Sequence, residues 1–164
     1  MRMVHEQVHA TCVAIGGVGV LLRGPSGAGK SDLALRLIDG GGANGPRLVA
    51  DDRVDLTLRA GRVWARAPGP LKGLLEVRGV GILPMKAVDE IAIALVCDLV
   101  APPLVERLPE VVTTPILDLD IPFIRLAPFE ASAPAKIRLA LRRLPWDSQE
   151  SDADAVVGRI GEQP

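Results

Sequence analysis

Short apolar runs, bounded by glycine, proline or charged residues, recur along the chain and predict a strand-rich fold. Residues 10–22 hold two such runs broken by a glycine pair, which indicates two strands joined by a tight turn. Residues 54–66 alternate apolar and polar positions around a central Ala60–Gly61, the pattern of a β-hairpin. Further strands are expected at residues 48–50, 74–83, 91–97, 116–122 and 123–126.

Two segments have helical character. Residues 32–39 have a helical composition, and the glycine-rich stretch 40–46 ends them. Residues 133–144 place apolar side chains on one face, with Ser132 as the expected N-cap and Pro145 as the stop. One early helix followed by many short strands differs from the regular strand–helix alternation of nucleoside-monophosphate kinases and GTPases. The pattern therefore predicts an α/β domain with a mixed, strand-rich sheet.

A glycine-rich run between the strand at 18–22 and the first helix has the spacing of a phosphate-binding P-loop. Its glycines let successive backbone N–H groups point inward at phosphate oxygens, and the following helix adds the positive end of its dipole. The lysine supplies a charge for the outer phosphates, and the last serine offers a hydroxyl to Mg²⁺. The alternative is an ordinary glycine turn. The run consists of Gly24, Pro25, Ser26, Gly27, Ala28, Gly29, Lys30 and Ser31.

Two aspartates follow the short apolar segment at residues 48–50. In P-loop proteins a strand ending in an acidic residue lies beside the P-loop strand and holds the metal ion or its water. Because adjacent side chains at a strand end face different directions, Asp51 and Asp52 can divide the work, one near the metal and the other near the incoming nucleophile. The alternative is a polar turn after a strand.

Composition and charge narrow the class of protein. The 164 residues fit one domain, and a formal net charge of −1 argues against a nucleic-acid or anionic-membrane partner. No apolar run reaches the roughly 18 residues of a membrane span, and Cys12 and Cys97 lie in apolar runs, as buried thiols of a reducing compartment do. We expect a cytoplasmic domain over residues 1–146, followed by a mobile, acidic tail at 147–164.

Five sequence blocks together resemble the bifunctional HPr kinase/phosphorylase family. The resemblance implies a P-loop kinase domain related to phosphoenolpyruvate carboxykinase, with ATP and Mg²⁺ as cofactors and a homo-oligomeric assembly. The implied substrate is a seryl hydroxyl on HPr, the phosphocarrier of the sugar phosphotransferase system. Only eight residues precede the first block, as in a short form of the family. The blocks are His9, the P-loop Gly24–Ser31, Leu48–Val54, Leu75–Ile82 and Glu106–Leu108.

The same resemblance implies roles for individual residues. Lys30 contacts the triphosphate, while Ser31, Asp51 and Glu76 form the metal site. Asp52 matches the family's general base, which accepts the seryl proton and returns it in the reverse reaction. His9 and Asp51 lie beside it as a pair that sets its charge state. Arg107 matches a catalytic arginine that stabilises charge on the transferring phosphoryl group.

Two departures from the family pattern bear on function. The glycine-rich loop of longer members is replaced at residues 84–90, and the basic loop associated with dephosphorylation appears at residues 127–132 without Lys or Arg. The kinase reaction is therefore better supported than phosphorolysis. Two other hypotheses stay open: a small-molecule P-loop kinase and a non-catalytic ATP-binding regulatory module.

Overall fold

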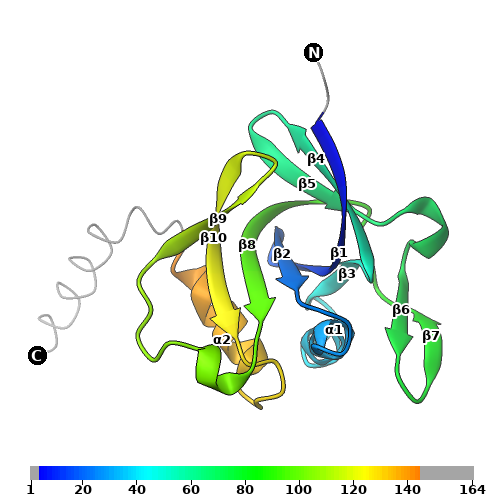
Figure 1. Ribbon diagram of the computed structural model, residues 1–164. Coiled ribbons are helices and arrows are strands. Elements are labelled where there is room, and N and C mark those ends of the chain that lie inside the picture. The colour runs from blue at the N-terminus through cyan, green and yellow to red at the C-terminus, as the bar shows by residue number, and fades with distance from the viewer. Residues whose placement is uncertain (1–3, 145–164) are drawn as a thin grey trace, which may run out of the picture.

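The computed structural model describes residues 4–144, and the tail expected at 147–164 lies outside these residues. Most of the chain forms one large sheet, with a separate two-stranded hairpin to its side (Figure 1). The elements in chain order are β1 (Val4–Ile15), β2 (Val18–Arg23), α1 (Lys30–Asp39), β3 (Arg47–Ala50), β4 (Arg53–Arg59), β5 (Arg62–Arg66), β6 (Leu74–Val77), β7 (Gly81–Pro84), β8 (Ile91–Leu99), β9 (Val112–Ile116), β10 (Leu119–Leu126) and α2 (Ala133–Arg142).

The large sheet curls because its first strand is long enough to pair with three others. The N-terminal half of β1 pairs with β4, and its C-terminal half pairs with β2 on one edge and β3 on the other. From β4 the sheet continues in the order β5, β8, β10 and β9. Because β2 also pairs with β8, strands β1, β4, β5, β8 and β2 form a closed ring of pairings. Parallel and antiparallel pairs both occur, so the prediction of a mixed, strand-rich α/β sheet is confirmed.

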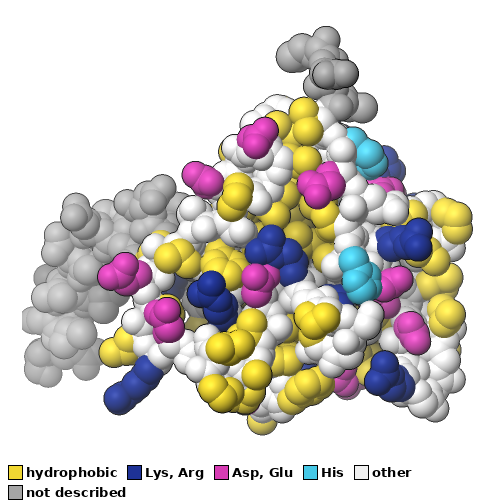
Figure 2. Space-filling view, viewed as in Figure 1, with side chains coloured by type: hydrophobic (Ala, Val, Ile, Leu, Met, Phe, Trp, Pro, Cys, Tyr) yellow, Lys and Arg dark blue, Asp and Glu magenta, His cyan; other side chains and the backbone are white. Residues whose placement is uncertain are grey.

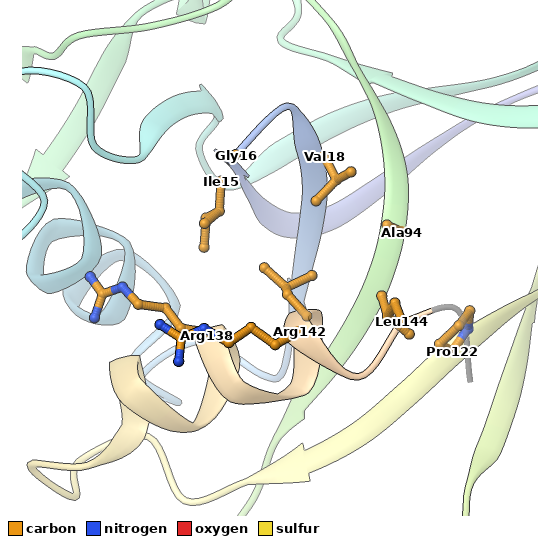
Figure 3. A pocket seen from close by; sticks show the side chains of 9 residues that line it. Ile15, Gly16, Val18, Ala94, Pro122, Arg138, Arg142 and Leu144 are labelled. Carbon is orange, nitrogen blue, oxygen red and sulfur yellow. The ribbon is translucent and has the colours of Figure 1, made fainter. Parts of the chain in front are cut away.

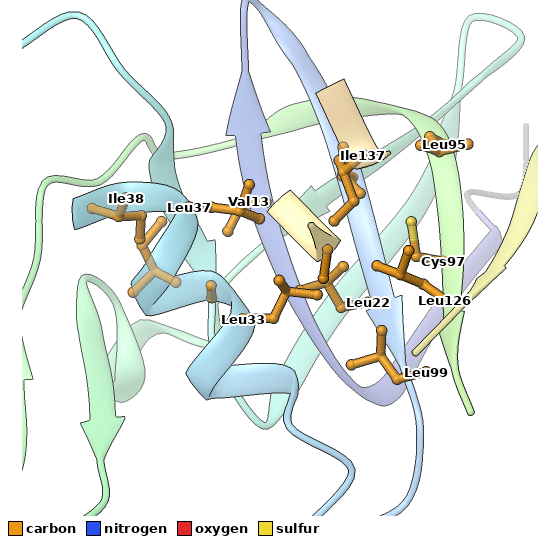
Figure 4. Close-up of a cluster of buried hydrophobic side chains, with 14 of the residues drawn as sticks. Val13, Leu22, Leu33, Leu37, Ile38, Leu95, Cys97, Leu99, Leu126 and Ile137 are labelled. Atoms are coloured by element: carbon orange, nitrogen blue, oxygen red, sulfur yellow. The ribbon is translucent and has the colours of Figure 1, made fainter. Parts of the chain in front are cut away.

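The core that positions the P-loop lies between the sheet and the two helices (Figure 4). Leu33 and Leu37 of α1 are fully buried against Leu22 of β2, the strand that leads into the P-loop. Ile137 of α2 is fully buried in the same cluster. Burying each such side chain contributes about 1.5–3 kcal/mol, so the start of α1 is held firmly on the sheet.

Three strand predictions were wrong in detail. The strand expected at 74–83 is the hairpin β6–β7, whose strands pair from Val77 opposite Gly81. The boundary expected between Pro122 and Phe123 lies instead at Leu117 and Asp118, whose positive φ angles of 48° and 64° form a two-residue turn between β9 and β10. The strand before the two aspartates, β3, pairs with β1 and not with the P-loop strand β2.

The second helix agrees with its prediction on its apolar face and differs at its ends. Ile137 and its neighbours one turn later pack into the core, as the sequence pattern requires. The helix ends at Arg142, two residues before the expected end, and Ser132 occupies the N-cap position without a side-chain capping bond from the described residues. Pro134 in the first turn replaces one of the N–H groups that a cap would satisfy.

Both cysteines are free thiols buried in the sheet, as predicted from their apolar neighbours. Burial raises the pKa of both Cys12 and Cys97 far above the usual range. Since the thiolate is the reactive form, we expect neither cysteine to react with iodoacetamide in the native protein, and both to react in guanidinium chloride. Intact mass after each treatment measures this, and rapid native alkylation would contradict it.

Candidate active site

The P-loop connects the end of β2 at Arg23 to the start of α1 at Lys30. Gly27 and Gly29 have φ angles of 82° and 94°, in the left-handed region that favours glycine. At Gly24 an added Cβ would lie 2.8 Å from the Ala28 side chain, so a larger residue there would force the loop to shift. The glycine spacing is therefore required for this tight turn.

The first turn of α1 presents its backbone N–H groups toward the loop. Gly29 is the N-cap, and no side chain of residues 4–144 caps it. Lys30 is only 7% exposed, and its Nζ donates to the carbonyl oxygens of Gly24 at 2.6 Å and Pro25 at 3.0 Å. Burial lowers the pKa of Lys30, and the nearby Asp52 and Asp51 carboxylates oppose that shift. Helix amides and a fixed ammonium together make an anion-binding site.

The buried carboxylate of Asp51 connects the segment after β3 to β1, α1 and β6 through hydrogen bonds. Oδ1 accepts hydrogen bonds from Thr11 Oγ1 at 2.9 Å, Ser31 Oγ at 2.8 Å and the backbone N–H of Asp52 at 3.1 Å. Oδ2 accepts from the backbone N–H of Glu76 at 3.2 Å. The sequence interpretation missed Thr11, and the available signal was a single hydroxyl in an otherwise apolar run.

Asp52 faces away from Asp51 and into solvent-accessible space, as expected for adjacent residues at a strand end. Its Oδ1 lies 2.6 Å from His9 Nε2, with the Asp52 and His9 side chains 63% and 48% exposed. The φ angle of Asp52 is 57°, a left-handed conformation that aspartate and asparagine tolerate better than other non-glycine residues. The backbone thus turns sharply and places this carboxylate beside the P-loop.

One cavity of about 370 Å³ gathers most of the predicted site residues. It contains His9, Lys30, Ser31, Asp52 and Glu76, together with Ser26, Gly27 and Gly29 of the P-loop. Acidic, basic and histidine side chains cluster at the surface next to the β6–β7 hairpin (Figure 2). Six further lining residues were not among the predicted site residues: Thr11, Asp32, Leu35, Val77, Arg78 and Phe129.

Arg107 is the one predicted catalytic residue that does not line this cavity. The predicted residues Gly24, Pro25, Ala28 and Asp51 do not line it either, but they belong to the P-loop or hydrogen-bond to it. Arg107 lies in the segment between β8 and β9, where its side chain is exposed. A catalytic contact from Arg107 would therefore require that segment to approach the P-loop.

A larger groove of about 660 Å³ lies between α2 and the β1–β2 turn (Figure 3). Aliphatic side chains such as Ile15, Val18 and Leu141 line most of it. Among its described lining residues only Arg138 and Arg142 are charged, and neither faces a carboxylate or hydroxyl partner there. Its chemistry does not suit catalysis, so size alone does not identify the site.

The residues around Asp51 fit a magnesium ion that keeps most of its own water. Within residues 4–144 no cluster of three or more His, Cys, Asp or Glu is placed to hold a metal. Mg²⁺ is commonly bound through one or two carboxylates plus substrate phosphates, which Asp51, Glu76 and the Ser31 hydroxyl match.

Within residues 4–144, no helix has the length and apolar character needed to cross a membrane.

Comparisons with known proteins agree on one family. The family profile described as HPr Serine kinase C-terminal domain matches residues 3–127. An HPr kinase/phosphorylase of Lactobacillus delbrueckii subsp. bulgaricus is 44% identical over 57% of this chain and 31% of its own length. One from Peptoclostridium acidaminophilum is 48% identical over 49% of this chain and 25% of its own length. The chain thus spans about a third or less of these relatives.

A solved structure extends the similarity to three dimensions. The HPr(Ser) kinase/phosphatase of Coxiella burnetii superimposes with a TM-score of 0.74 at 26% identity. The match covers 88% of this chain and 99% of that one. The strand-rich sheet with its P-loop is therefore the arrangement found in that protein.

Proposed function

Because this chain belongs to the family of the HPr serine kinase C-terminal domain, we propose that it transfers the γ-phosphoryl group of ATP to a seryl hydroxyl of HPr. The observation that carries the proposal is the cavity in which an exposed carboxylate, Asp52, lies with Lys30 and Ser31 of the P-loop. A nucleotide site alone suits many proteins, whereas a carboxylate open to an incoming hydroxyl suits phosphoryl transfer.

In the proposed reaction the seryl oxygen attacks the γ-phosphorus and gives its proton to Asp52. The bond from the γ-phosphorus to the β,γ-bridging oxygen breaks, and ADP leaves. His9, at 2.6 Å from Asp52, holds the carboxylate in place. Backbone N–H groups of the P-loop, such as those of Gly29, Lys30 and Ser31, and the Lys30 ammonium bind the phosphates through charge-assisted hydrogen bonds.

Ser31, Asp51 and Glu76 are the proposed holders of Mg²⁺. When bound, the ion neutralises charge on the phosphate oxygens. Asp51 supports the site in a second way, because it already orients the Ser31 hydroxyl at 2.8 Å. Arg107 is proposed to stabilise the transferring phosphoryl group once the segment after β8 approaches the cavity.

The reverse reaction is a second proposed activity, favoured by the names of both curated relatives, which include phosphorylase. An oxygen of inorganic phosphate would attack the phosphorus of seryl phosphate, and Asp52 would return the proton to the leaving seryl oxygen. The products are free HPr and pyrophosphate. The loop at residues 127–132 lacks Lys and Arg, so we expect this reaction to be slower than the kinase reaction.

The test is intact-mass analysis of HPr from the same organism after incubation with this protein and Mg·ATP. The expected result is one added phosphoryl group, absent when the acceptor serine of HPr is replaced by alanine. The reverse reaction is then measured by removing ATP, adding inorganic phosphate and following the loss of the phosphoryl group from phosphorylated HPr. If ATP binds but HPr gains no mass, the proposal fails for this acceptor, and a small-molecule kinase or a regulatory ATP-binding module gains support.

A homo-oligomer is the proposed assembly of this domain. The β6–β7 hairpin projects from the body of the molecule (Figure 1), and its Val80 and Ile82 are 70% and 68% exposed. Two exposed aliphatic side chains on one hairpin favour an interface. Light scattering on the purified protein should give a multiple of the single-chain mass, and Ile82→Asp should lower it. A single-chain mass for the unmodified protein would refute the proposal.

A further inference from the structure

We propose that Phe129 forms the platform on which the base of the bound nucleotide stacks. The inference rests on the proposed function for the presence of a nucleotide, and it adds the part of the site that recognises the base. Phe129 lies in the turn between β10 and α2 and lines the P-loop cavity. Its side chain is 71% exposed. An exposed phenylalanine ring forgoes the stabilisation of burial, so a ligand that covers the ring recovers it.

The ring lies directly against the phosphate-binding loop. A Cβ added to Gly29 would be 2.9 Å from Cε1 and 3.0 Å from Cζ of Phe129. The ring edge therefore rests on the backbone of the residue before Lys30, at the point where the phosphates are proposed to bind. A base attached through its ribose to those phosphates lies within reach of this ring.

The turn that carries Phe129 is anchored to the P-loop helix. Arg36 of α1 donates hydrogen bonds to the carbonyl oxygens of Pro128 and Glu130, one on each side of the phenylalanine. The same guanidinium pairs with Asp32 at 3.0 Å. Because the backbone on both sides of Phe129 is tied to α1, the ring is positioned relative to the phosphate site before any ligand binds.

The rest of the cavity divides into two kinds of surface. Lys30, Ser31 and Glu76 offer charge and hydroxyl groups to phosphates and a metal ion, whereas Leu35, Val77 and Phe129 supply apolar surface. A nucleotide has the same two parts, a charged phosphate chain and a flat base with an apolar face. Stacking on an aromatic ring accepts any purine, so the platform predicts similar effects for ATP and GTP.

The test compares binding of Mg·ATP, Mg·GTP and inorganic tripolyphosphate, which lacks base and ribose, by isothermal titration calorimetry. For Phe129→Ala we expect affinity for both nucleotides to fall about 5- to 150-fold and affinity for tripolyphosphate to stay the same. Phe129→Trp keeps a stacking ring and should retain affinity, with quenching of its fluorescence by nucleotide. Leu139→Ala, at a 55% exposed side chain on α2 outside the cavity, is the matched control and should change nothing.

Several outcomes would overturn the platform. Equal losses for ATP and tripolyphosphate would mean that the ring shapes the loop and does not contact the base. If Phe129→Ala leaves nucleotide affinity unchanged but raises the KM for HPr, Phe129 contacts the acceptor protein and not the base. If the unmodified protein does not bind nucleotide, there is no base for the ring to stack on. If the contrast between ATP and tripolyphosphate holds while HPr is not phosphorylated, the platform stands and the proposed function fails.

Discussion

Asp52→Asn is expected to lower the rate of phosphoryl transfer to HPr by about 10²- to 10⁴-fold, the usual contribution of a general base. The amide cannot accept the seryl proton, whereas the P-loop contacts of Lys30 stay intact. Affinity for Mg·ATP should therefore change little. Single-turnover transfer to HPr and calorimetric binding of ATP measure the two quantities separately.

Asparagine is the right replacement because of the backbone at this position. Asp52 has a φ angle of 57°, which asparagine tolerates better than alanine does, so the variant keeps the local turn. Asp55→Asn removes the same charge from the neighbouring strand β4, where the carboxylate accepts a hydrogen bond from Gln7 at 2.8 Å. That control should keep full activity. If Asp52→Asn transfers the phosphoryl group at an undiminished rate, a group other than Asp52 accepts the seryl proton.

Asp51→Asn is expected to destabilise the fold by about 1–3 kcal/mol, the cost of leaving a buried polar group unsatisfied. Both carboxylate oxygens face backbone N–H groups, those of Asp52 at one oxygen and Glu76 at the other. Whichever oxygen becomes the amide nitrogen, a donor then faces a donor. Backbone N–H groups cannot reverse, so the conflict cannot be relieved by rotating a hydroxyl.

Unfolding in guanidinium chloride, followed by circular dichroism, measures this loss. Asp55→Asn again serves as control and should stay within about 0.5 kcal/mol of the unmodified protein, as surface substitutions usually do. The Asp51 variant should also need more Mg²⁺ for activity, because Asp51 orients the Ser31 hydroxyl. Unchanged stability would show that the hydrogen bonds of Asp51 contribute little to the fold.

The parts of the site that lie close together in sequence were predictable. The glycine-rich run forms the tight loop that its pattern predicted, with left-handed φ angles at Gly27 and Gly29. The helix after it ends at Asp39 as predicted and begins at Lys30, two residues before the predicted start. The prediction that Asp51 and Asp52 face different directions also agrees with the structure, although the left-handed turn at Asp52, with φ of 57°, and not strand alternation produces it. These features depend on local conformation, which neighbouring residues determine.

Other parts of the site join segments far apart in the chain, and the sequence interpretation missed them. Thr11 meets Asp51 across 40 positions. Phe129 lies against the P-loop in a turn whose carbonyl oxygens at Pro128 and Glu130 accept hydrogen bonds from Arg36 of α1. Arg107, named by resemblance, lies outside the cavity, so its role stays a proposal.

By itself the sequence determined the phosphate-binding loop, the strand-rich class of the domain and the pair of aspartates, because glycine spacing and hydrophobic periodicity act over a few residues. The tertiary structure alone decided that β3 pairs with β1 and that one buried carboxylate joins β1, α1 and β6. Strand pairing and buried hydrogen bonds depend on the simultaneous packing of distant segments. No local pattern records which of those segments will meet.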